Sequence, residues 1–239
     1  MYKERAYRSW TGGPDLVAFG VMEGQTDLAV YAETDLSGQA RAAVLTYRRD
    51  LEDYIKSDPA FYSALEPVTV GDHAPQIVRA MASAAQKAGV GPMAAVAGAF
   101  AEFVGRDLCR LSGEVIVENG GDIFIRTAKT RTVGIYAGEL SPFTGKLAME
   151  VGPAEDGMGV CTSSGTVSHS LSFGSSDAIV IISKDAALAD AAATAAGNVI
   201  RSPDDIAKGV DVARSIEGVL GVVAIAKDKM GSWGDIRFV

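Results

Sequence analysis

The sequence lacks the features of a disulfide-stabilised, zinc-binding or nucleic-acid-binding protein. Only two cysteines, Cys109 and Cys161, occur in 239 residues, and two widely spaced thiols form neither a zinc site nor a disulfide framework. Positive charge is also scarce, because 22 Lys and Arg residues face 30 Asp and Glu residues. A nucleic-acid-binding surface needs clustered Lys and Arg, so we expect no nucleic-acid partner.

Long apolar runs are absent as well. The N-terminal stretch MYKERAYRSW is charged and lacks the apolar segment of a signal peptide. The longest uncharged run of small residues, between Lys87 and Glu102, is too short to cross a bilayer. From these absences, and from the scarcity of cysteine, we expect a cytoplasmic protein with no membrane partner.

The periodicity of apolar residues predicts a single domain, 1–239, in which helices pack on a sheet. Strands are predicted at 2–10, 16–22, 26–33, 114–117, 123–126, 132–137, 146–152, 158–162, 178–183, 219–226 and 235–239. Helices are predicted at 37–55, 74–88, 93–108, 185–198 and 202–216. This order of elements favours an α+β fold (α/β layered) with a mixed, largely antiparallel sheet packed against helices.

Asp190 is the most informative single residue. It lies in an alanine-rich helix with Thr194 four residues on, so both side chains occupy the same helix face. A carboxylate in a tightly packed helix is costly to bury unless it is paired, hydrogen-bonded or bound to a cation. Asp and Thr oxygens suit magnesium or calcium, which predicts a cation site. The alternative is that Asp190 faces solvent or caps a neighbouring loop.

A second candidate is the polar run that follows the strand predicted at 158–162. Its backbone N–H groups and hydroxyls can hold an anion, and its members are Thr162, Ser163, Ser164 and Gly165. The alternative is an ordinary Ser/Thr turn between strands. No G-x-S-x-G elbow or G-K-[ST] phosphate loop is present. Ser164 with His169 could act as nucleophile and base, but no third group is indicated.

Three short motifs occur in a fixed order along the second half of the chain. They are Glu118-Asn119-Gly120-Gly121-Asp122-Ile123, Thr162-Ser163-Ser164-Gly165 and the helical segment ADAAATA at 189–195. In this order they resemble the motif set of the ApbE superfamily, whose members are FAD:protein FMN transferases. The longer stretch GVCTSSGTVSHSLSFG resembles a smaller ApbE-like group with a shortened His segment.

This resemblance implies an ApbE/T-fold-like architecture and a magnesium site. The implied ligands are Asp190, Thr194 and a backbone carbonyl near Val160. In the family, the ion holds the FAD pyrophosphate and activates it for attack by a Thr or Ser of a target protein, as a Lewis acid and template. Magnesium, FAD and a protein acceptor are therefore the implied cofactor, ligand and partner. The glycine turn (119–122) and the Ser/Thr turn (162–165) are implied to shape the pocket.

One segment departs from the family pattern. The transferases carry H-x-I-D-P-x-T-G after the Ser/Thr turn, whereas here 168–174 is shorter and lacks both Asp-Pro and Thr-Gly. His169 is the implied catalytic base of this segment. Three functions stay open: an FMN transferase or FAD-pyrophosphate-cleaving enzyme, a different reaction or binding role with another phosphorylated ligand, and a scaffold with a vestigial site.

Overall fold

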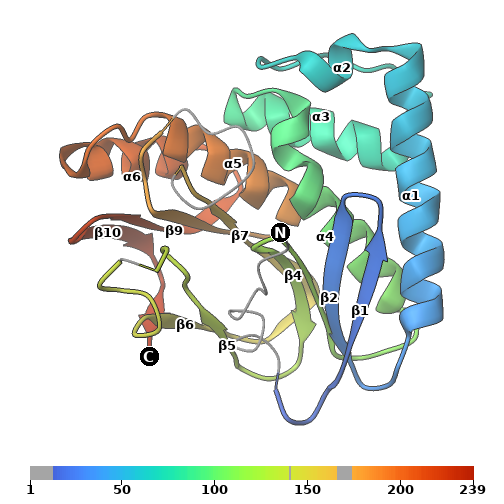
Figure 1. The fold of residues 1–239 in the computed structure, drawn as a ribbon, viewed down its shortest axis with the longest axis horizontal. Helices are drawn as coiled ribbons and strands as arrows, with labels where there is room; N and C mark the ends of the chain where they lie inside the picture. The colour runs from blue at the N-terminus through green and yellow to red at the C-terminus, as the bar shows by residue number, and fades with distance from the viewer. Residues whose placement is uncertain (1–12, 140, 166–173) are drawn as a thin grey trace.

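The computed structural model describes residues 13–139, 141–165 and 174–239 (Figure 1). Their strands form an eight-stranded sheet in the order β1-β2-β3-β4-β7-β8-β9-β10 and a three-stranded sheet in the order β11-β6-β5. Every strand pairing among these residues is antiparallel, so the mixed component predicted from the sequence is not found there. The bounds are β1 Val17–Glu23, β2 Thr26–Ala32, β3 Val115–Asn119, β4 Asp122–Thr127, β5 Arg131–Gly134, β6 Ala148–Val151, β7 Ala154–Ser163, β8 Ala178–Ser183, β9 Val219–Ala226, β10 Lys229–Gly234 and β11 Arg237–Phe238.

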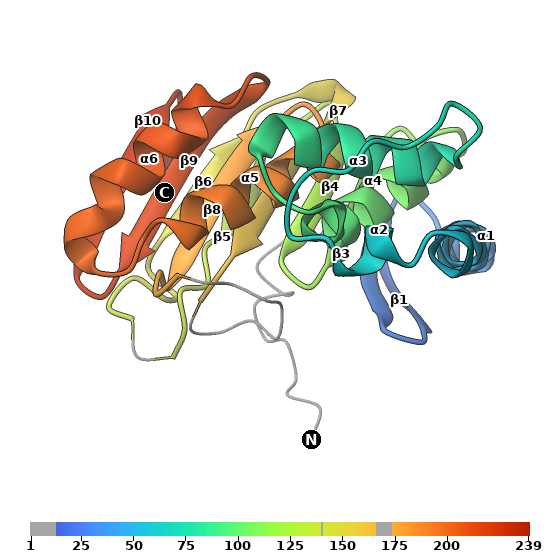
Figure 2. The same ribbon diagram turned by 90° about the horizontal axis from the view of Figure 1, so that it is seen from above.

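The helices cover one face of the large sheet, and the small sheet packs on the other (Figures 1 and 2). The helical elements are α1 Ser37–Ser57, α2 Ala60–Ser63, α3 Gln76–Ala88, η2 Pro92–Ala95, α4 Val96–Leu108, α5 Ala186–Asn198, η3 Pro203–Asp205 and α6 Ile206–Ser215. Because both faces of the central strands are covered, these strands are apolar at nearly every position. Strand β8, AIVIIS, is buried throughout. The α+β fold predicted from the sequence is confirmed.

The glycine turn joins β3 to β4 as a tight hairpin. Gly120 and Gly121 both have positive φ values, 70° and 105°, which glycine adopts at little cost. The register then places Asn119 opposite Asp122. Strand β4 pairs on its other side with β7, where Asp122 lies opposite Cys161. This pairing brings the glycine turn and the end of β7 together, although about 40 residues separate them in the chain.

Helix α5 lies against β7 because small residues allow a close approach. A Cβ atom added to Gly159 would lie 2.4 Å from Ala186 Cα. A Cβ atom added to Gly98 of α4 would lie 2.2 Å from the Ala186 carbonyl oxygen. The first turn of α5 is therefore packed tightly between β7 and α4, and it is this packing that determines where Asp190 lies.

Several predicted boundaries differ from the structure. Strand β7 begins at Ala154 and not at 158, and the strand predicted at 132–137 ends at Gly134. The helix predicted at 93–108 begins as the 3-10 turn η2, and its α-helical part starts at Val96. At the C-terminus, the chain turns at Lys227, which has a φ of 54°, and β10 begins at Lys229. The predicted strand 235–239 is reduced to β11, because the preceding segment, for which no strand is predicted, forms β10 and pairs with β9. The strand predicted at 2–10 lies outside the described residues.

Within the described ranges, no single helix has the length and hydropathy needed to span a membrane. The segments Gln76–Ala88 and Pro92–Leu108 meet that test only together, across a bend of 105°.

Candidate functional site

Asp190 lies on α5 and faces the beginning of α4. Its Oδ2 atom accepts a hydrogen bond from the Gly98 N–H at 2.9 Å, and the Ala97 N–H also stabilises its charged form. Both N–H groups belong to the first turn of α4, which has no acceptor within its own helix and no side-chain cap of its own. Asp190 therefore caps a neighbouring helix. This is close to the alternative, stated from the sequence, that Asp190 caps a neighbouring loop.

Asp122 lies on the same face of the sheet, beneath α5. The residue is 7% exposed, and its Oδ1 atom has no hydrogen-bond partner in the described structure. A carboxylate offers about four acceptor positions, and a buried polar atom without a partner calls for an explanation such as a proton, a water molecule or an ion.

The two carboxyl groups influence each other's ionisation. Burial raises the pKa of Asp122 well above its ordinary value, and the charges of Asp190 and Glu118 raise it further. Burial likewise raises the pKa of Asp190 to about 7, with partial compensation from the two α4 N–H groups. Part of Asp190 reaches the surface, but its carboxyl group is enclosed by protein. Two carboxylates that oppose each other's charge favour either a bound proton or a bound cation.

Among the residues that the structure covers, neither Asp122 nor Asp190 forms an ion pair with Lys, Arg or His. The same residues contain no group of three or more His, Cys, Asp and Glu that could hold a metal ion. A cation here would need further oxygens from hydroxyls, backbone carbonyls or a bound ligand, as magnesium commonly does.

Thr194 and Val160 are placed differently relative to the carboxylates. Thr194 is half-buried on α5, one turn after Asp190. Val160 lies in the middle of β7 with paired strands on both sides, opposite Ile123 and Ile182. Its side chain belongs to the core between the two sheets, and backbone carbonyls in a paired strand lie in the plane of the sheet. The Thr194 side chain thus shares the helix α5 with Asp190, whereas the Val160 side chain lies on the other face of the sheet, and a role for the Val160 carbonyl stays a prediction.

The segment 162–165, predicted as a Ser/Thr turn, begins inside β7: Thr162 and Ser163 are the last two residues of the strand and pair with β8. Thr162 is half-buried, Ser163 and Ser164 are buried, and the Gly165 N–H donates to the Ser176 carbonyl at 2.9 Å. The two turns lie side by side, since a Cβ atom on Gly121 would be 3.8 Å from Thr162 Cβ. His169, predicted as a base, lies outside the described residues.

Asn119 uses its side chain for packing. Its Nδ2 atom donates to the Ala97 carbonyl at 3.1 Å, so it joins the glycine turn to the start of α4. The preceding residue, Glu118, is 1% exposed and accepts a hydrogen bond from the Gly121 N–H at 2.7 Å. Sequence reasoning did not select Glu118 as a site residue, although a carboxylate next to a glycine pair was visible.

Glu102 is a second residue that sequence reasoning missed. It is 6% exposed, and its Oε2 atom accepts hydrogen bonds from the N–H groups of Ala186 and Ala187 at 2.8 and 3.3 Å. The available signal was its position as the first charged residue after a long apolar run. Its partners, more than 80 residues away, could not be read from the sequence.

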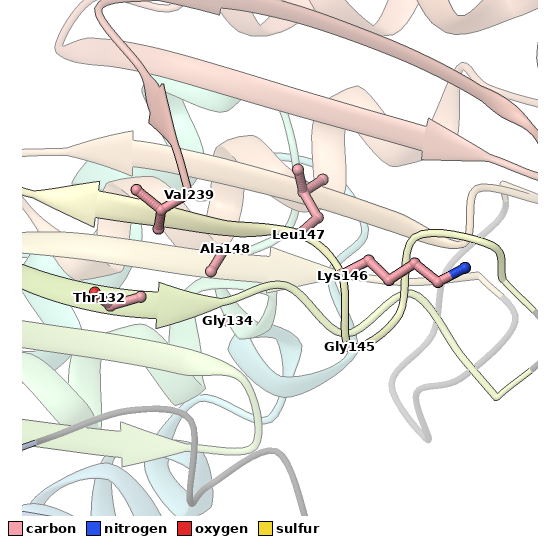
Figure 3. Close-up of a pocket in the computed structure, with 7 residues that line it drawn as sticks. All are labelled: Thr132, Gly134, Gly145, Lys146, Leu147, Ala148 and Val239. Atoms are coloured by element: carbon pink, nitrogen blue, oxygen red, sulfur yellow. The ribbon is translucent and has the colours of Figure 1, made fainter.

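A cavity of about 320 Å³ lies elsewhere, at the small sheet (Figure 3). Its lining comes from β5, β6 and the C-terminal residues, on the opposite side of the large sheet from α5. The lining residues are Thr132, Gly134, Gly145, Lys146, Leu147, Ala148 and Val239. With one charged side chain, this cavity offers little chemistry beside the carboxylate pair.

The fold and site define an α+β protein with one helix-covered antiparallel sheet and a buried pair of carboxyl groups beside two glycine-containing turns. A family model described as AbpE bacteria matches residues 8–223, and the chain belongs to this family. It is 43% identical over 211 residues to a UPF0280 protein of Methanocella arvoryzae, covering 88% of this chain and 85% of that protein. A UPF0280 protein of Methanocaldococcus jannaschii is 43% identical over 203 residues, covering 83% and 82%.

Solved structures show where else this fold occurs. The apo form of the Pseudomonas stutzeri flavinyl transferase ApbE aligns with a TM-score of 0.61 and 16% identity, covering 91% of this chain and 93% of that one. A variant of the Vibrio cholerae flavin transferase ApbE aligns with a TM-score of 0.57 and 10% identity, covering 91% and 96%. At these identities the likeness establishes the shared ApbE fold, as the sequence motifs predicted.

Proposed function

We propose that this chain is a single ApbE-like domain that binds FAD together with magnesium and transfers its FMN part to a Thr or Ser of a protein. The observation that supports this proposal best is the Oδ1 atom of Asp122, which has no hydrogen-bond partner among the described residues and is buried beside the carboxyl group of Asp190. A divalent cation would satisfy that atom and neutralise both carboxylates in one step.

The residues present fit magnesium. Asp190 Oδ2 accepts from the Gly98 N–H at 2.9 Å, and in this proposal its Oδ1 atom binds the ion. Asp122 and the hydroxyl of Thr194 supply further hard oxygens from neighbouring positions. Magnesium typically takes one or two carboxylates and completes its shell with water and substrate phosphate oxygens. Because the site is acidic, it can bind an anionic pyrophosphate only if a cation lies between the carboxylates and the phosphate groups.

Each part of the site has a role in this proposal. When bound, the magnesium ion would act as a Lewis acid on the pyrophosphate. Asp190 and Asp122 hold the ion, and the α4 N–H groups fix the orientation of Asp190. The exposed Gly120 and the Thr162 hydroxyl lie where a ligand can approach the backbone closely. His169 is proposed to accept the proton of the attacking hydroxyl.

The shortened segment after the Ser/Thr turn favours a second candidate. Because 168–174 lacks the Asp-Pro and Thr-Gly of the transferase pattern, the chain could bind FAD or another phosphorylated ligand without transferring it. If this second candidate is an enzyme, it hydrolyses the FAD pyrophosphate with water and transfers no FMN to a protein.

Calorimetric titration with FAD, with and without magnesium, tests the binding step. We expect FAD to bind only with magnesium, and Asp190→Ala to abolish binding. Asp211→Ala, a matched change at an exposed aspartate of α6, should bind as the natural chain does. Equal binding by Asp190→Ala would contradict the site. Incubation with FAD and a Thr-containing acceptor, followed by mass spectrometry, then separates transfer from binding, because only transfer adds the mass of FMN.

A further inference from the structure

Helices α4 and α5 cap each other through a matched pair of carboxylates. Glu102 of α4 accepts from the N–H groups of Ala186 and Ala187 at the start of α5, at 2.8 and 3.3 Å. Asp190 of α5 accepts from the N–H of Gly98 at the start of α4, at 2.9 Å. In α4, Glu102 lies four residues after Gly98, whose N–H binds Asp190. In α5, Asp190 lies four residues after Ala186, whose N–H binds Glu102, so the two contacts are nearly symmetric.

Neither helix has a cap from its own sequence. No side-chain hydrogen bond reaches the N-terminal turn of either helix from its own N-cap residue. Carboxylates at these turns are favoured by the free N–H groups and the helix dipole. Glu102 is held in turn by Arg106, whose Nε atom donates to Oε1 at 2.9 Å. Both oxygens of Glu102 are thereby engaged, which fixes its side chain.

The start of α5 is also fixed from the sheet. The Cys161 thiol donates to the Ala186 carbonyl at 3.3 Å, and Gly159 leaves no room between β7 and Ala186. Contacts from the sheet restrain how close α5 lies to β7, whereas the Glu102 contact restrains its position along and around its own axis. Asp190 follows one turn later, so that axial position sets the distance between its carboxyl group and Asp122.

We infer that Glu102 is a positioning residue of the carboxylate site: it sets α5 so that one oxygen of Asp190 meets α4 while the other faces Asp122 and a shared cation. This inference rests on the cation site of the proposed function. In this inference Glu102 acts through α5 and not as a ligand, because one of its oxygens accepts from the Arg106 side chain and the other from the backbone N–H groups of Ala186 and Ala187.

The test is titration with Mn²⁺, followed by electron paramagnetic resonance, on the full chain. Asp190→Ala should lose binding. Glu102→Ala should weaken Mn²⁺ binding by about tenfold or more, as the loss of a group that supports a metal ligand commonly does. Glu102→Gln should weaken it much less, because its amide oxygen still accepts from the Ala186 N–H. Leu51→Ala, a buried change in α1, controls for destabilisation and should bind as the natural chain does.

The outcomes separate the two proposals. If the natural chain binds no Mn²⁺, the proposed function fails and this inference fails with it. If the natural chain binds and Asp190→Ala does not, but Glu102→Ala keeps full affinity, only the positioning role is overturned. Equal losses for Glu102→Gln and Glu102→Ala would show that charge, not position, matters, and would also overturn it. Glu102→Gln decides the question if Glu102→Ala does not fold, since loss of binding in a folded Gln variant contradicts positioning.

Discussion

Substitution of Gly98 by alanine perturbs the contact between α4 and α5 most directly. The new methyl carbon would lie 2.2 Å from the Ala186 carbonyl oxygen and 2.8 Å from Asp190 Cβ, whereas ordinary contacts begin at 3.4 Å. Because the nearest obstruction is backbone, the two helices must move apart by roughly 1 Å. That movement stretches the hydrogen bond from the Gly98 N–H to Asp190 beyond its present 2.9 Å.

Two costs combine in this variant. Overpacking of a filled core costs about 1–3 kcal/mol, and loss of a helix cap costs about 1 kcal/mol. The higher helix propensity of alanine offsets about 0.5–1 kcal/mol of this loss, so we expect the free energy of unfolding to fall by about 1–3.5 kcal/mol. Each kcal/mol lowers the melting temperature by about 2–4 °C in a chain of this size. Urea denaturation measures the first quantity and calorimetry the second.

Gly38→Ala is the matched control. Gly38 lies in the first turn of α1, is exposed, and has no atom within 4 Å of an added Cβ. Alanine is favoured over glycine in helices by about 0.5–1 kcal/mol, so this variant should be at least as stable as the natural chain. If Gly98→Ala proves equally stable, the close helix contact does not exist as described and the positioning of Asp190 by α4 is refuted.

Three further predictions concern ionisation and the buried polar groups. Since burial raises the pKa of Asp122 and that of Asp190 (to about 7), these two groups bind more protons in the metal-free folded chain than in the unfolded chain between about pH 4 and 7. The contribution of this pair to the free energy of unfolding therefore falls as pH rises. In urea titrations with a chelator, Asp122→Asn should become more stable relative to the natural chain as pH rises across this range, and a difference that stays constant with pH would contradict the shifts. Arg131→Met should lower the free energy of unfolding by about 3–5 kcal/mol, because Arg131 and Glu114 are a buried ion pair joined at 2.7 Å. An unchanged urea midpoint would refute this prediction. Burial raises the pKa of the Cys161 thiol well above its ordinary value, so a thiol reagent should modify Cys161 only after denaturation, whereas the half-buried Cys109 is more accessible. Rapid labelling of Cys161 in the folded chain, located by peptide mass spectrometry, would count against its burial.

Local patterns accounted for most of the elements. The first hairpin, predicted at 16–22 and 26–33, matches β1 and β2 because a Gly24 turn separates two alternating runs. The start at Ser202 is confirmed by a capping box, in which Asp205 accepts from the Ser202 N–H at 2.9 Å. Such signals act over a few residues, so the sequence alone exposes them.

The candidate site was visible only in part. Asp190 stood out because a carboxylate is unusual among alanines, and the three motifs placed the glycine and Ser/Thr turns in the same region. The partners of Asp190 were not visible, since Gly98 lies 92 residues away and reads as one small residue among many. Glu102 was hidden for the same reason, because a cap supplied by another helix has no local spacing. The surroundings of the Val160 carbonyl likewise depend on strand pairing on both sides of β7.

The central claim is that the carboxyl groups of Asp122 and Asp190 share a divalent cation. Crystals soaked in Mn²⁺ and measured for anomalous scattering test it most directly. The account predicts a single strong peak within about 2–2.5 Å of an oxygen of each carboxylate, lost in Asp190→Ala crystals. A peak elsewhere, or no peak at a Mn²⁺ concentration that stabilises the protein in solution, would contradict it.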